Sequence, residues 1–227
     1  MRKIVLASAS SRRKELLEKI GLRVEVDPPE YVEDLSLDLA PHELVKKLSL
    51  EKAHIVAARH RDAIIIAADT IGVLERQIIG KPQNEAEAKE MLGRLSGRAH
   101  LVITGFTIID TTKSKVLTKS VETKVYFRRL TTCEIDAYVR SGEPLGKAGG
   151  YAIQGRGALL VDKIEGDFYN VVGLSLSALG EGLRTFGVDL MIPSPLRGGG
   201  KSLPRTDTGV KVKNDCTPSE VLDSPWR

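Results

Sequence analysis

Ala63-Ile64-Ile65-Ile66-Ala67-Ala68-Asp69-Thr70 is the stretch of sequence that decides the fold. Its first six residues form a continuous apolar run without polar alternation, which is typical of a β-strand buried on both faces. The run ends in Asp69, so we expect this carboxylate to stand at the end of a buried strand. Such a strand among helical segments predicts an α/β architecture.

Helical and strand patterns extend on both sides of this stretch. The predicted helices cover residues 11–20, 41–60, 85–95, 131–141 and 174–186, and the other predicted strands cover 3–7, 22–26, 100–110 and 116–127. The last two strands are joined by a polar turn around Lys113 and Ser114, so they pair antiparallel. Within 116–127, alternate residues from Val121 to Phe127 are expected to share one face. The predicted fold class is α/β with a mixed β-sheet flanked by helices.

Composition and charge narrow the classes of function. The chain has 227 residues, of which 41% are hydrophobic and 28% charged, as in ordinary globular proteins. Its net charge is +4, but residues 192–227 hold 6 Lys or Arg and 4 Asp or Glu, which leaves a nearly balanced 28 and 26 for the rest. This nearly neutral charge of residues 1–191, together with an aromatic content of only 4%, argues against nucleic acid as a partner.

A change in composition after Met191 predicts a domain boundary. Residues 192–227 are rich in Pro and Gly and have no apolar period, so we expect a domain over 1–191 and a disordered or loosely attached tail over 192–227. Only Cys133 and Cys216 are present, which indicates no disulfide framework. The first apolar run is too short for a signal peptide, and none has membrane-spanning length, so we expect a cytoplasmic protein without a membrane partner.

Residues suited to phosphate lie between the first strand and the first helix. Ser8 and Ser10 precede Arg12 and Arg13, and backbone N–H groups at a helix start bind anions, which hydroxyls and guanidinium groups reinforce. The alternative is a serine N-cap followed by two solvated arginines. From these residues alone both interpretations stay open.

Asp69 and Thr70 are the second candidate pair. A carboxylate at the carboxyl end of a strand, where ligands gather in open α/β sheets, can hold a divalent ion or take a proton from water. The alternative is that Asp69 only turns the chain.

Three further segments carry residues suited to a ligand. Lys81 follows Gly80, and a plain turn explains this pair equally well. Glu33 stands in an acidic loop and Lys52 on the second predicted helix, and spacing alone does not show that they meet. Gln154 ends a glycine-flanked stretch, and its planar amide is able to read a base edge, although a Gly-rich turn is the alternative.

Taken in order, these segments resemble the Maf family over essentially all of residues 2–190. The opening Leu-Ala-Ser8-Ala-Ser10-Ser11-Arg12-Arg13-Lys-Glu-Leu-Leu matches the family's Leu-Ala-Ser-x-Ser-Pro-Arg-Arg-x-Glu-Leu-Leu. The further matches are the Glu33 loop, Lys52-Ala53, Ala68-Asp69-Thr70, Gly80-Lys81-Pro82, Leu95-Ser-Gly-Arg-Ala-His100, Thr104-Gly105, Ser141-Gly-Glu-Pro144, Ala148-Gly-Gly-Tyr-Ala-Ile-Gln154-Gly155 and Asn170-Val-Val-Gly-Leu174.

The resemblance implies a Maf/ITPase-like fold, with an elongated mixed sheet, helices on its flanks and two lobes around a central cleft. It implies a nucleotide pyrophosphatase that hydrolyses a nucleoside triphosphate between the α and β phosphates, with a divalent metal such as Mg²⁺ or Mn²⁺. The catalytic proton acceptor would be Asp69. The other implied roles are phosphate binding by Ser8, Arg13, Lys52 and Lys81, and metal binding by Glu33 and Asp69.

The resemblance also points to one branch of the family. Arg12, Thr70 and Gln154 match the base-facing positions of the branch that prefers dTTP and UTP. The alternatives are hydrolysis of a modified nucleotide such as 7-methyl-GTP, or a non-enzymatic nucleotide-binding regulator of septum formation. A homodimer is also compatible with the family.

Two positions depart from the family pattern: Ser11 and Ser175 replace prolines. Because neither change removes a functional side chain, we expect modest effects on rigidity.

Overall fold

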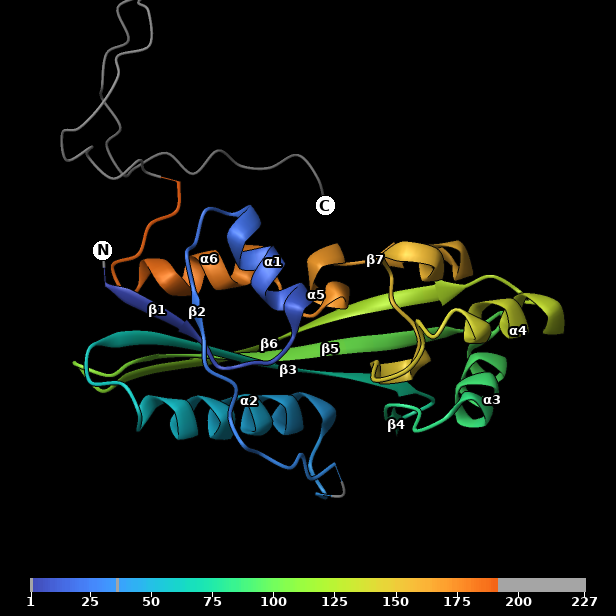
Figure 1. Cartoon of the computed structure of the whole chain (residues 1–227), viewed down its shortest axis with the longest axis horizontal. Coiled ribbons are helices and arrows are strands. Elements are labelled where there is room, and N and C mark those ends of the chain that lie inside the picture. Colours follow the sequence, from blue (N-terminus) through green and yellow to red (C-terminus); the bar gives the residue numbers. More distant parts are fainter. Residues whose placement is uncertain (1, 36, 192–227) are drawn as a thin grey trace, which may run out of the picture. The chain divides into compact units, whose positions relative to one another are not determined.

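The computed structural model of the chain describes residues 2–35 and 37–191, so the tail predicted over 192–227 lies outside the described residues. A seven-stranded sheet runs in the order β2-β1-β3-β5-β6-β7, with β4 paired to β3 (Figure 1). The strands are β1 (Lys3–Leu6), β2 (Glu25–Val26), β3 (Ala63–Leu74), β4 (Gln77–Ile79), β5 (Ala99–Asp110), β6 (Lys115–Phe127) and β7 (Val161–Glu165). β1 is parallel to β2 and β3, and the other pairs are antiparallel. The predicted mixed sheet is confirmed.

Helices cover both faces of this sheet. They are α1 (Ser11–Lys19), α2 (Pro41–Ala57), α3 (Glu85–Leu95), α4 (Thr132–Arg140), α5 (Phe168–Val172) and α6 (Leu176–Arg184), with 3₁₀ turns η1 (Ala148–Gly150) and η2 (Gly155–Leu160). α2 lies along one face, and α1, α5 and α6 lie on the other, while α3 and α4 stand at the far end of the long strands (Figure 1). No helix among the described residues is long and apolar enough to cross a membrane.

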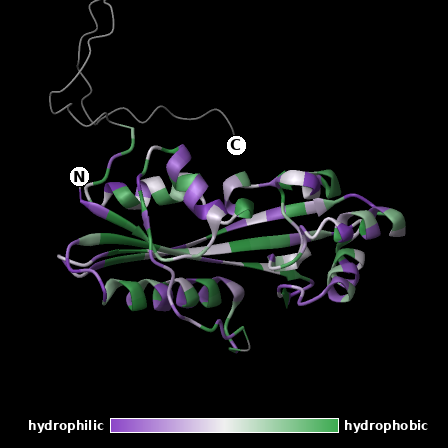
Figure 2. Cartoon of the chain, in the orientation of Figure 1, coloured by the Kyte–Doolittle hydropathy of each residue, from purple (hydrophilic) through white to green (hydrophobic). Residues whose placement is uncertain are grey.

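Apolar residues of the central strands supply the core on both faces. β3 and β5 are largely hydrophobic along their length (Figure 2). Because side chains alternate along a strand, Ile65 and Ala67 pack against Ala53 and Val56 of α2, whereas Ile64 and Ile66 belong to the core on the other face of the sheet. This two-sided burial is what the apolar run predicts. The alternation from Val121 to Phe127 likewise faces inward, since Val121 is half-buried and the other three are buried.

The prediction that Asp69 ends its strand is wrong. β3 continues to Leu74, because the following apolar and β-branched residues pair antiparallel with β5, including Thr70 with Thr104. Its neighbour β1 stops earlier, with Leu6 opposite Ile66. Asp69 therefore lies in the middle of its own strand but just beyond the carboxyl end of β1. At this point β3 has no β1 residue paired beside it.

The two departures from the family pattern fall at helix starts. Ser175 is the N-cap of α6, and its hydroxyl accepts a hydrogen bond from Ala178 N at 3.3 Å. Serine is among the best N-cap residues, so this replacement keeps the helix start satisfied. Ser11 is the exposed first residue of α1, a position that suits proline because the backbone N–H there needs no helical partner.

Candidate active site

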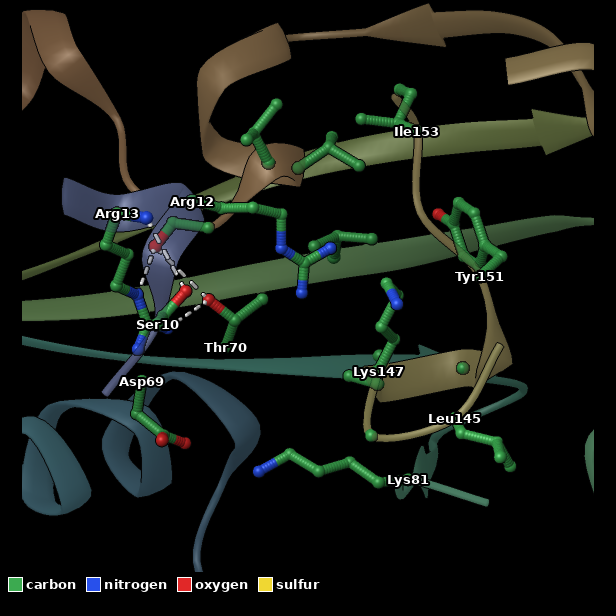
Figure 3. Close-up of a pocket in the computed structure, with 18 of the residues that line it drawn as sticks. Ser10, Arg12, Arg13, Asp69, Thr70, Lys81, Leu145, Lys147, Tyr151 and Ile153 are labelled. Atoms are coloured by element: carbon green, nitrogen blue, oxygen red, sulfur yellow. Dashed lines mark hydrogen bonds between the residues drawn. The ribbon is translucent and has the colours of Figure 1, made fainter. Parts of the chain in front are cut away.

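A cleft of about 530 Å³ opens where β1 stops, and Ser10, Arg12, Arg13, Asp69 and Thr70 contribute to one side of it. A second hollow of about 330 Å³ adjoins it, shares Arg13, Glu33 and Lys81 with the cleft, and adds Ser8 and Lys52. Consecutive strand residues point to opposite faces, so Asp69 faces α2 while Thr70 faces α1. The open edge beside β3 lets groups from both faces meet, as Figure 3 shows.

Charged side chains from three segments converge beside Asp69. Lys52 Nζ, from α2, donates to Glu33 Oε1 at 2.7 Å and also to Asp69 Oδ1. Lys81 Nζ, from the segment after β4, donates to Glu33 Oε2 at 2.9 Å. The structure thus brings together Glu33 and Lys52, which sequence spacing alone left unconnected.

The two carboxylates of this cluster have opposite pKa shifts. Partial burial on its own would raise the pKa of Glu33, but its hydrogen bonds to Lys52 and Lys81 and their charges lower that pKa to about 2. For Asp69, deep burial outweighs the attraction of Lys52 and Arg13, and the nearby Glu33 adds to the rise, so its pKa is raised above the usual value. Glu33 is therefore the fixed anion of the pair, and Asp69 is the more basic one.

The carboxylates of Glu33 and Asp69 fit a divalent cation whose remaining coordination positions are filled by a phosphate ligand and water. Asp69 Oδ2 is buried and has no hydrogen-bond partner among the described residues, so one carboxylate oxygen is free to bind. No group of three His, Cys, Asp or Glu able to hold a metal occurs in residues 2–35 and 37–191. Two carboxylates with phosphate oxygens and water form a common magnesium site, whereas a site made by protein groups alone needs more donors.

Arg13 is held rigidly at the start of α1. Its guanidinium donates to Ser8 Oγ at 3.2 Å, to Thr70 Oγ1 at 3.0 Å and to the Gly173 carbonyl at 2.9 Å. Ser10 caps the helix by accepting from Arg13 N, so the serine N-cap expected as an alternative is present. The rest of that alternative, two solvated arginines, is wrong for Arg13, because all three of its guanidinium nitrogens donate hydrogen bonds within the protein. Arg12 and Arg13 both line the cleft.

The three predicted base-facing residues are not all in the cleft. Arg12 and Thr70 line it, but Gln154 is not among its lining residues, although the preceding Ile153 is. Gln154 is half-buried at the start of η2.

The cleft also contains residues to which sequence reasoning gave no role. Lys147 lines the wall opposite Arg12, and the buried pair His100 and Tyr151 lines the far end, with His100 Nε2 2.8 Å from the Tyr151 hydroxyl. Burial lowers the pKa of His100 to about 4, so it is neutral at physiological pH. His100 and Tyr151 belong to quoted family motifs, and Lys147 stands between two of them, which was the only available signal.

Clustered lysines, arginines and two carboxylates at a sheet opening are typical of proteins that bind phosphate-bearing ligands. The family model described as Maf-like protein matches residues 3–186, so the chain belongs to the Maf family. The dTTP/UTP pyrophosphatases of Bacillus cereus (strain AH820) and Bacillus anthracis (strain CDC 684 / NRRL 3495) are each 50% identical over 190 residues, covering 84% of this chain and 98% of theirs. A HAM1 protein from Coxiella burnetii matches with a TM-score of 0.42 at 18% identity, over 57% of this chain and 75% of that one.

Proposed function

We propose that this chain is a pyrophosphatase that hydrolyses dTTP and UTP to the nucleoside monophosphate and diphosphate. The observation that carries the proposal is the convergence of Lys52, Lys81 and Arg13 with the carboxylates of Glu33 and Asp69 at one opening of the sheet. The names of relatives at 50% identity over 98% of their length support the choice of substrate.

The chemistry follows from the cluster. Water attacks the α-phosphorus, the bond to the bridging oxygen breaks, and the diphosphate leaves with the bonding electron pair. Asp69 takes the proton of the attacking water, because its Oδ2 has no hydrogen-bond partner among the described residues and is available to accept it. Lys52, Lys81 and Arg13 stabilise the negative charge that moves onto the leaving diphosphate.

A divalent cation, Mg²⁺ or Mn²⁺, belongs to the proposal. Glu33 and Asp69 would hold it, and when bound it neutralises phosphate charge as a Lewis acid. The reaction also implies a cytoplasmic location, where nucleoside triphosphates are found.

A panel of nucleotides tests the proposal. Purified full-length protein is incubated with Mg²⁺ and dTTP, UTP, CTP or 7-methyl-GTP, and released diphosphate is quantified. The expected result is diphosphate and monophosphate in equal amounts, with kcat/KM highest for dTTP and UTP. Binding without diphosphate release would favour a non-enzymatic regulator, and a higher kcat/KM for 7-methyl-GTP or CTP would contradict the substrate assignment.

A further inference from the structure

The wall of the cleft opposite α1 is a glycine-rich loop built to present Lys147. Lys147 Nζ donates to the Glu143 carbonyl of the same loop, and Gly149 N donates to the Gly80 carbonyl at 2.9 Å, which ties the loop to the segment that carries Lys81. Glu143 extends this bracing, since its carboxylate accepts from the backbone N–H of Arg156 and Gly157, each at 3.2 Å. Lys147 is thus held in place before any ligand arrives.

Arg12 faces Lys147 across the cleft. Both side chains extend toward the same space from opposite walls (Figure 3). No side-chain hydrogen bond or ion pair joins Arg12 to any other described residue, and Lys147 has only the carbonyl of Glu143. The pKa of Lys147 is lowered first by burial and then by the charge of Arg12, so the two cations feel one another. The space between these two positively charged donors is therefore suited to a ligand group that accepts hydrogen bonds.

The surroundings of this pair distinguish it from the phosphate end. Near Asp69, the carboxylates already pair with Lys52 and Lys81. The loop that carries Lys147 also brings Leu145, Tyr151 and Ile153 to the same wall of the cleft (Figure 3). Apolar and aromatic side chains beside two hydrogen-bond donors suit a planar base better than a phosphate chain.

Ammonium and guanidinium groups donate hydrogen bonds and accept none. Uracil and thymine present carbonyl oxygens at positions 2 and 4, whereas cytosine replaces the oxygen at position 4 with an amino donor. We propose that Lys147, with Arg12, donates to the carbonyl oxygen at position 4 of the pyrimidine and so selects uracil and thymine over cytosine. This inference rests on the proposed function and adds Lys147 to the predicted base-facing residues.

Calorimetric binding of UMP and CMP tests the proposal without turnover. The two ligands share ribose and phosphate, so their affinity ratio isolates the base. For wild type we expect tighter binding of UMP. In Lys147→Met the affinity for UMP should fall about tenfold or more, because a charge-assisted hydrogen bond is lost, while the affinity for CMP changes little. Lys147→Arg keeps a donor and should retain the preference.

Lys46→Met is the matched control, since Lys46 is also a half-buried lysine but pairs with Glu43 outside the cleft. It should leave both affinities unchanged. An equal loss of UMP and CMP binding in Lys147→Met would place Lys147 on a group that the two ligands share and overturn the proposal. An unchanged UMP affinity, or a wild type without preference, would overturn it as well. Should Lys147→Met not fold, loss of the preference in a folded Lys147→Arg would contradict it. Diphosphate release from UTP by wild type tests the proposed function separately.

Discussion

Gly105 is the position where a single methyl group should disturb both the fold and the site. It lies on β5 opposite Asp69, beneath α2. A Cβ at this position would lie 2.3 Å from the Val45 carbonyl oxygen and 2.8 Å from Lys46 N, whereas ordinary contact begins at 3.4 Å. Because both obstacles are backbone atoms, no side-chain rotation relieves the clash. The helix must move away from the sheet by about 1 Å, which is the difference between the 2.3 Å distance to the Val45 carbonyl oxygen and the 3.4 Å of ordinary contact.

The displacement should reach the active site. Lys52 follows Val45 by two helical turns, on the same side of α2, and its ammonium holds Glu33 and Asp69. For Gly105→Ala we expect a loss of about 1–3 kcal/mol in unfolding free energy, which is a fall in Tm of about 2–12 °C for a domain of this size. Misplacement by about 1 Å should lower kcat/KM for UTP by up to about 100-fold.

Thermal melts and steady-state kinetics of Gly105→Ala check this, with Gly93→Ala as the matched control. Gly93 lies inside α3, and a Cβ there would meet nothing within 4 Å. Alanine is the better helix former, so the control should be neutral or more stable by up to about 1 kcal/mol. A Gly105→Ala protein with the Tm and kcat/KM of wild type would refute the direct contact between α2 and β5.

Two further predictions concern stability. Arg2 donates to the buried Asp110 from both terminal guanidinium nitrogens, at 2.5 and 2.7 Å, and this pairing holds the pKa of Asp110 well below its usual value. The contribution of the pair to stability is therefore complete above the unfolded pKa of about 3.9 and is lost as the pH falls below it. Asp110→Asn should cost about 1–3 kcal/mol of unfolding free energy at neutral pH and weaken the loss of stability at acid pH. An Asp110→Asn denaturation profile superimposable on that of wild type would refute this prediction. Deletion of residues 192–227, which have no apolar period, should leave Tm and kcat/KM nearly unchanged, and a large drop in Tm would place the domain boundary elsewhere.

Local patterns predicted the long elements of the fold well. The helix predicted over 85–95 has the observed bounds, and the long hairpin of β5 and β6 was predicted to within a residue at its outer ends. Short elements were missed, among them β7 and the five-residue α5, because so few residues carry no readable period and depend on tertiary pairing. Asp69 was misplaced at a strand end because the continuous apolar run stops at Ala68, whereas the strand itself continues to Leu74.

The site could be predicted only where family motifs mark it. The family prediction is confirmed, and Ser8, Arg13, Lys52 and Lys81 do gather around Glu33 and Asp69. No local signal in the sequence shows that Lys52 bridges two carboxylates from distant segments, since that depends on how closely α2 approaches β3. The position of Lys147 depends likewise on long-range bonds of its loop, so sequence spacing gave it no role.

The most direct test of the account is Asp69→Asn assayed with UTP and Mg²⁺. Asparagine keeps the shape but cannot take a proton, and Lys52 retains Glu33 as a partner, so the variant should fold with a Tm near that of wild type and still bind UTP. The account predicts that kcat falls by about 10²–10⁴-fold, the usual cost of losing a general base. A folded Asp69→Asn protein that releases diphosphate at nearly the wild-type rate would contradict it.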